Sequence, residues 1–209
     1  MEAVGDGVSS TMSGMSVLAL TNFGGQSEYV SVPIDQVWEK PESLSFDQAV
    51  ALPVSYLTAY VLLVVMGSLR KGESVLIHNV GGGLGLAALD IAKHVGAETF
   101  GTASGSKHGF LLNERGFDHA IDYRDKDWLP VLMQMTNGQG VELIIDPIGG
   151  SNWKKSYKAL RSTGRLGIYG VSTISAVGLR GKLRAINLLL RSPRFSPIAL
   201  LNSNKGVSA

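Results

Sequence analysis

Residues 74–85 read SVLIHNVGGGLG, and this stretch decides the fold. The apolar run at 75–80 is typical of a buried strand, and the glycines after it open a helical stretch at 83–95. In a nucleotide-binding βαβ unit, such glycines permit a tight turn, let the backbone approach a pyrophosphate and allow the helix to pack closely. The helix start also favours an anion. We interpret the loop as dinucleotide-binding; the alternative is a turn without a ligand.

Short apolar stretches alternate with helical ones along the rest of the chain. The expected strands are 75–80, 98–103, 119–123, 141–146 and 165–170, and the expected helices are 83–95, 106–115, 126–137 and 151–161. Strands joined by helices form right-handed crossovers, so the pattern predicts an α/β fold with a doubly wound parallel (Rossmann) sheet. A last helix, with an apolar face flanked by arginines, is expected at 179–191.

The N-terminal part follows a different pattern. Residues 17–33 are expected to form two short strands around the turn at Gly24 and Gly25, as part of a small antiparallel barrel. Because the pattern of expected strands and helices changes after this part, we expect two domains, 1–52 and 53–209.

Two helices are expected between the barrel piece and the first strand of the sheet. Ser45 and Gln48 have the spacing of a capping box, which predicts a helix start at Ser45. Pro53 suits the first turn of a second helix, which runs from Val54 to Met66. This second helix is apolar on most sides, so we expect it to be largely buried.

The composition excludes several classes of protein. The chain is 44% hydrophobic and 17% charged, which is typical of a globular protein, and it has no Cys. The absence of Cys excludes a thiolate zinc site and a cysteine nucleophile, and four scattered His do not suggest another metal site. The longest wholly apolar run, 61–67, is far shorter than the roughly 18 residues of a membrane span, and no leader is visible. We therefore expect a cytoplasmic protein without a metal.

The charges are unevenly distributed along the chain. Residues 1–150 hold 8 basic and 17 acidic side chains, whereas residues 151–209 hold 11 basic and no acidic ones. A basic segment can mark a polyanion-binding face, but the aromatic residues in it are not interleaved with the basic ones as base stacking requires. We do not expect a nucleic-acid partner.

The second expected strand indicates which dinucleotide is bound. Enzymes that use NAD place an Asp or Glu about 20 residues past the glycine loop, where it holds the ribose 2′-OH. Here the strand continues into GTASGSKH, residues 101–108, which contain no carboxylate. The hydroxyl of Ser104 and the cation of Lys107 suit a 2′-phosphate instead, which predicts NADPH. The alternative is that Lys107 is a solvated residue at a helix start.

Several motifs together resemble the zinc-independent quinone oxidoreductase branch of the medium-chain dehydrogenase/reductase superfamily, and most closely its VAT-1 homolog-like members. They are PVSYLTAY (53–60), HNVGGGLG (78–85), GTASGSKH (101–108), IDY (121–123), DPIGG (146–150) and GRLGIYG (164–170). Residues 2–33 resemble the middle of the family's GroES-like domain. The resemblance implies a fragment, with a partial GroES-like domain at 1–52 and a C-terminally truncated NADP-binding Rossmann domain at 53–209.

The resemblance also implies which residues form the site. It places Gly82, Gly83, Leu84 and Gly85 at the pyrophosphate and Ser104, Lys107 and Tyr123 at the 2′-phosphate and adenosine end. It places Tyr56, as a candidate catalytic residue, and Thr58 near the nicotinamide. It places Pro147, Ile148, Gly149, Gly170, Val171 and Ser172 along the groove. For Tyr56 the alternative is core packing, and for His78 a hydrogen-bonded core histidine is favoured over an acid.

The activity implied is that of an NADPH-dependent oxidoreductase, which transfers a hydride to a quinone or an enone. We expect the fragment alone to turn over poorly, and we expect a homodimer whose contact edge begins at 204–209. The alternative is a non-catalytic, NADPH-binding, VAT-1-like protein at a membrane surface, for which the basic helix at 179–191 is suited. A methyltransferase shares the glycine loop but would need an acidic residue at the end of the second strand.

Overall fold

The structure is a computed structural model that describes residues 1–172, 188, 190 and 192–209. The chain divides into two compact units, Met1–Leu57 and Thr58–Ala209, with the boundary inside a helix. The helix expected at 179–191 lies outside the described residues, except for 188 and 190. The barrel and cofactor-domain identities of 1–52 and 53–209 stay predictions.

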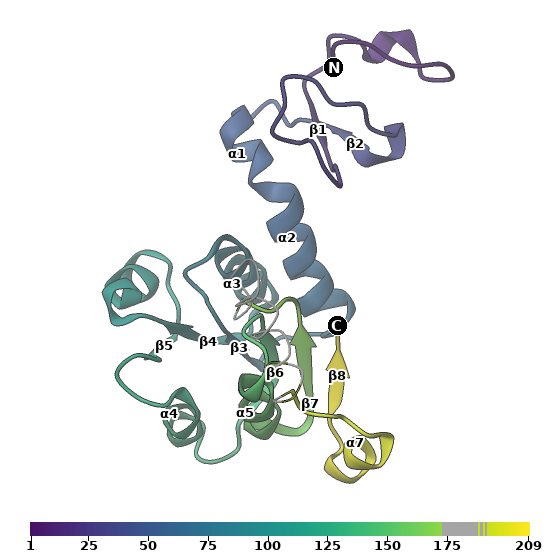
Figure 1. Cartoon of the computed structure of the whole chain (residues 1–209). Helices are drawn as coiled ribbons and strands as arrows, with labels where there is room; N and C mark the ends of the chain where they lie inside the picture. The colour runs from purple at the N-terminus through teal and green to yellow at the C-terminus, as the bar shows by residue number, and fades with distance from the viewer. Residues whose placement is uncertain (173–187, 189, 191) are drawn as a thin grey trace. The chain divides into compact units, whose positions relative to one another are not determined.

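A six-stranded parallel sheet forms the centre of the second unit, in the order β5-β4-β3-β6-β7-β8 (Figure 1). The strands are β3 (Ser74–Ile77), β4 (Glu98–Ala103), β5 (His119–Asp122), β6 (Val141–Asp146), β7 (Leu160–Ile168) and β8 (Gly206–Ser208). Sequential strands β3, β4 and β5 run outward in one direction, and β6, β7 and β8 run outward in the other. This arrangement confirms the expected doubly wound parallel sheet.

Helices cover both faces of this sheet. They are α3 (Gly83–Val95), α4 (Trp128–Met135), α5 (Ser151–Ala159) and α7 (Pro197–Ser203). Figure 1 shows α3 on one face of the sheet and α4 with α5 on the other. The helix expected at 106–115 is present as a continuous helical segment over 105–114, which consists mainly of a 3-10 turn, η4 (Gly105–Lys107), and a π-helical stretch, η5 (Phe110–Glu114).

The core of the second unit lies between the central strands and their helices. Every residue of β3 is buried, and so are Leu143, Ile144 and Ile145 of β6. On the helix side, Ala87, Ala88 and Ala92 of α3 are fully covered. These small side chains let the helix lie close to the sheet and place its first turn beside the carboxyl ends of β3 and β4.

The first unit contains a two-stranded antiparallel sheet, and here the sequence prediction was wrong. Strand β1 (Val17–Ala19) pairs with β2 (Val37–Glu39) rather than with residues 27–32. The hydroxyl of Ser27 donates to the carbonyls of Gly24 (2.5 Å) and Tyr29 (2.8 Å). A local turn therefore satisfies backbone carbonyls that a hairpin would have paired.

The helices after this sheet begin as predicted. In α1 (Phe46–Val50), the backbone N–H of Gln48 donates to the Ser45 hydroxyl, and the N–H of Ser45 donates to the Gln48 side chain. The capping box is thus confirmed. Helix α2 (Leu52–Tyr60) carries Pro53 in its first turn and continues as a π-helical stretch, η3 (Val61–Val65).

The expectation that this second helix is largely buried was wrong. Ala59, Leu62 and Leu63 are buried, whereas Val61 and Val65 are exposed. Only the face that packs on the sheet of the second unit is covered, because residues four apart lie on one side of a helix.

The helical stretch Phe46–Val65 is long and apolar enough, by length and composition, to cross a membrane. No uninterrupted apolar run covers this stretch, because Asp47, Gln48, Ser55 and Thr58 lie within it. Apolar helices of soluble proteins meet the same criterion, so no membrane assignment follows from it.

Candidate cofactor site

The glycine loop between β3 and α3 is held by its own backbone. Asn79 has a positive φ of 54°, a conformation that Asn tolerates better than most residues, and its carbonyl accepts from the N–H of Gly82 (3.0 Å). The N–H of Val80 donates to the carbonyl of Thr102 (3.3 Å), which ties the loop to β4. Asn79 therefore forms the turn itself.

Helix α3 begins without a side-chain cap. Its N-cap residue is Gly82, and no side chain accepts from the first turn there. The first N–H groups of an α-helix have no partner within the helix, and together with the helix dipole they attract an anion. Gly83, Leu84 and Gly85 thus present backbone donors at the place where the sequence predicts a pyrophosphate.

Gly85 allows the helix to approach the loop closely. A Cβ atom at this position would lie 2.6 Å from Cα and O of Val80 and 2.7 Å from O of Asn79. All three atoms belong to the backbone, so they cannot move aside as a flexible side chain could. The position requires glycine for close packing, as expected for the third glycine of a dinucleotide-binding loop.

Lys107 lies against the glycine loop although 26 residues separate it from Gly81. Its Nζ donates to the carbonyl of Gly81 at 3.1 Å. On the same loop, Oγ of Ser104 and Oγ of Ser106 lie 3.2 Å apart. The structure therefore brings a cation and two hydroxyls from the end of β4 to the edge of the predicted phosphate site.

The end of β5 lies beside the end of β4. Ala103 and Asp122 are partners in register, and the N–H of Tyr123 donates to the carbonyl of Ala103 (3.3 Å). Half of the Tyr123 side chain is exposed. Tyr123 and Ser104 thus follow neighbouring strand ends, as the resemblance implied for the adenosine end.

The groove residues after β6 and β7 are joined by hydrogen bonds. The N–H of Ile148 donates to Oδ1 of Asp146 (2.7 Å), and the N–H of Ser172 donates to the carbonyl of Pro147 (2.7 Å). Gly149 has a φ of 92° and Gly170 a φ of 135°, so both need the conformational freedom of glycine. Together with Val171, these residues lie at the carboxyl ends of the strands, where open α/β sheets bind ligands.

A buried polar network lies at the carboxyl ends of these strands. Ser156 of α5 donates its hydroxyl to Oδ2 of Asp146 (2.6 Å), and Nδ2 of Asn152 donates to the same oxygen (2.8 Å). Since the Ser156 proton is used in this way, Nε2 of His78 donates to Ser156 (3.2 Å). Nδ1 of His78 then accepts from the hydroxyl of Thr102 (2.9 Å). The network links the carboxyl ends of β3, β4 and β6.

The environment of His78 keeps its ring neutral. Complete burial lowers the pKa of His78 to about 4, against the opposing attraction of the Asp146 carboxylate. Burial likewise raises the pKa of Tyr169, and the charge of Asp146 adds to that effect. His78 is thus the hydrogen-bonded core histidine that the sequence favoured. The sequence did not identify its partners Thr102, Asp146 and Ser156, although polar residues in otherwise apolar strands are the signal for such a network.

The two residues expected near the nicotinamide lie on α2. Tyr56 belongs to the first unit and Thr58 to the second, and both side chains are half-buried. Tyr56 also takes part in at least one hydrogen bond, ring contact or electrostatic interaction. A catalytic role for Tyr56 stays a prediction.

Metal-binding groups are missing from the part of the chain that the structure describes. In residues 1–172 and the described positions beyond them, no three His, Cys, Asp or Glu side chains gather in a way that could hold a metal ion. The donors around the glycine loop are backbone N–H groups, hydroxyls and one ammonium group, which are chemically suited to phosphates.

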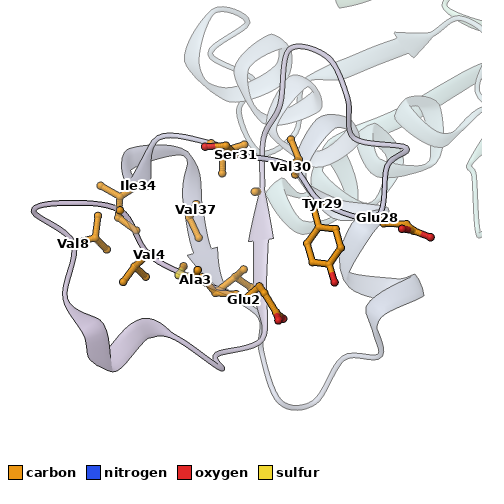
Figure 2. A pocket seen from close by; sticks show the side chains of 15 residues that line it. Glu2, Ala3, Val4, Val8, Glu28, Tyr29, Val30, Ser31, Ile34 and Val37 are labelled. Carbon is orange, nitrogen blue, oxygen red and sulfur yellow. The ribbon is translucent and has the colours of Figure 1, made fainter.

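A separate cavity of about 820 Å³ lies within the first unit (Figure 2). It is lined by residues 1–5 and 28–32 and by others around β1 and β2, among them Val8, Ile34 and Val37. Figure 2 shows that most of the labelled side chains are aliphatic, with the phenol of Tyr29, the hydroxyl of Ser31 and two carboxylates as the polar groups. None of these residues was singled out from the sequence.

Comparison with known proteins adds to this geometry. The family model described as zinc-binding dehydrogenase matches residues 83–205. The synaptic vesicle membrane protein VAT-1 homolog of Rattus norvegicus is 40% identical over 98% of this chain and 50% of its own length. The chain thus spans about half the length of this relative.

Two solved structures share the fold. The quinone oxidoreductase of Escherichia coli in complex with NADPH has a TM-score of 0.81 and 26% identity, over 99% of this chain and 59% of that chain. The CurK enoyl reductase has a TM-score of 0.77 and 33% identity, over 88% of this chain and 54% of that chain.

Proposed function

Because the chain belongs to the medium-chain dehydrogenase/reductase superfamily, in its zinc-independent branch, we propose that it binds NADPH at the glycine loop. The intact protein would then be an oxidoreductase that reduces a quinone or an enone. The solved relatives named above, a quinone oxidoreductase and an enoyl reductase, support this substrate class.

The contact between Lys107 and Gly81 carries the proposal. It places an ammonium group on the loop that precedes the uncapped first turn of α3, so one phosphate would meet backbone donors and another would meet a cation. Ser104 and Tyr123 flank this position on the ends of β4 and β5. Lys107 lies in η4, the turn that follows β4, so a side chain from outside the glycine loop supplies this cation.

NADPH would supply the hydride, and the described residues would orient it. Gly83, Leu84 and Gly85 would hold the pyrophosphate by their N–H groups. The loop at 147–149, fixed by Asp146, would line the groove toward the nicotinamide end. Exclusion of water from that groove protects a hydride from side reactions.

A second candidate function follows from the similarity to the VAT-1 homolog. That relative is named as a synaptic vesicle membrane protein, and its identity to this chain is higher than that of either enzyme named above. A protein that binds NADPH without turnover, at a membrane surface, would keep the same glycine loop and the same Lys107.

The expected homodimer also remains a proposal. Strand β8 follows β7 at one end of the sheet, and its residues Gly206–Ser208 fall within the segment 204–209 where the resemblance implied a contact edge. An exposed strand edge can pair with a second copy.

Steady-state assays of the intact protein, with a panel of quinones and enones and with NADPH and NADH, test the proposal. An oxidoreductase consumes NADPH in the presence of at least one of these acceptors. Binding of NADPH without consumption, together with retention on anionic vesicles, would favour the second candidate. No binding of either cofactor would exclude both.

A further inference from the structure

Asp122 places a carboxylate next to the loop that carries Ser104 and Lys107. Asp122 is the last residue of β5, and its register partner Ala103 is the last residue of β4. Strands β4 and β5 therefore end at the same level of the sheet. Asp122 belongs to β5, so it lies outside residues 101–108, in which the sequence has no carboxylate.

The contact between Asp122 and Gly105 is close. A Cβ atom on residue 105 would overlap Oδ2 of Asp122, so a glycine at this position lets the carboxylate lie against the loop backbone. The other oxygen, Oδ1, accepts from the N–H of Arg124 at 2.8 Å. One oxygen is thus anchored in its own turn while the other faces the loop at 104–107.

The two charges beside this loop favour different cofactors. A cation such as Lys107 attracts the 2′-phosphate of NADPH, whereas a neighbouring carboxylate repels it. A carboxylate at the ribose is also the group with which NAD enzymes hold the 2′-OH. Asp122 therefore opposes the effect of Lys107 on cofactor choice.

We infer that Asp122 is a specificity-determining residue whose carboxylate reduces the preference of this site for NADPH over NADH. The inference rests on the proposed function, since it assigns the 2′ end of the cofactor to the loop at 104–107. Lys107 of η4 and Asp122 of β5 would then act on the 2′ end of the cofactor with opposite charges.

The test compares Asp122→Asn with wild type by titration with NADPH and with NADH. Asparagine keeps an oxygen that can accept from Arg124 and removes only the charge. Loss of the repulsion should tighten NADPH binding by roughly threefold to tenfold, as expected for charges near a surface, and should not tighten NADH binding. The gain for NADPH should shrink at high salt.

A matched control is Asp125→Asn, which removes the same charge from an exposed residue of the same turn. It should change NADPH binding by less than Asp122→Asn does. Thermal melts of both variants should match wild type.

The inference is overturned if Asp122→Asn changes both dissociation constants equally, changes neither or weakens NADPH binding. It is also overturned if Asp125→Asn has the same effect as Asp122→Asn. These outcomes leave the proposed function intact as long as wild type binds NADPH. Absence of NADPH binding by wild type would overturn the proposed function and this inference together.

Discussion

The hydroxyl of Ser156 donates to Oδ2 of Asp146 at 2.6 Å, and both residues are fully buried. This bond fixes α5 to the carboxyl end of β6. It also leaves Ser156 able to accept from His78 (3.2 Å), so a neutral ring completes the network without an unpaired group. A protonated ring would place a second N–H against the Thr102 hydroxyl and a charge in a fully buried position.

The free energy of unfolding should therefore decrease as the pH falls, because the unfolded state can protonate His78 more readily. Its pKa is about 4 in the folded chain and 6.5 when unfolded, so between these values the unfolded state binds more protons. This contribution is fully present above about pH 6.5 and is lost as the pH falls toward 4. The loss should be on the order of a few kcal/mol, to be measured as the free energy of unfolding by urea.

The matched variant is His78→Gln, whose side chain can donate and accept but does not titrate. It should be less stable than wild type at pH 7, with a weaker dependence on pH between 6.5 and 4. The comparison removes the contribution of carboxylates, which both proteins share. Parallel stability curves over this range would contradict the assignment of the effect to His78.

Gly85→Ala should destabilise the second unit and weaken cofactor binding. The new methyl group would collide with backbone atoms of Val80 and Asn79, and overpacking of this kind costs about 1–3 kcal/mol. Gly109→Ala is the control, because a Cβ there meets nothing within 4 Å and its backbone is helical. That variant should be neutral or slightly more stable in thermal melts. Equal melting temperatures for Gly85→Ala and wild type would contradict the packing argument.

This chain should bind no stoichiometric zinc. This chain has no Cys, and the described residues gather no set of metal ligands. Elemental analysis after purification checks this expectation, and a chelator should leave NADPH binding unchanged. One tightly bound zinc per chain, contributed by this segment, would contradict it.

The sheet could be predicted from local patterns. The bounds of β4, β6 and α3 match the expected ranges, because apolar runs between glycines and a long amphipathic stretch are strong local signals. The capping box at Ser45 could be predicted for the same reason, because it involves only Ser45 and Gln48. Lys107 could be proposed as a site residue because its loop follows a strand end directly.

Features that depend on distant partners could not be predicted in this way. The pairing of β1 with β2 is set by contacts across 17 intervening residues and not by the Gly24 turn. The approach of Asp122 to Gly105 depends on which strands are neighbours in the sheet. The network around His78 joins residues up to 78 positions apart, so its members carry no common local signal.

Binding of NADPH and NADH by this chain, in wild type and Lys107→Ala, tests the central claim most directly. Wild type should bind NADPH more tightly than NADH by roughly tenfold to a hundredfold, as one charge-assisted hydrogen bond allows. Lys107→Ala should lose most of that preference and leave NADH binding nearly unchanged. Equal losses for both cofactors, no loss for either, or no NADPH binding by wild type would contradict the claim that Lys107 and the glycine loop form an NADPH site.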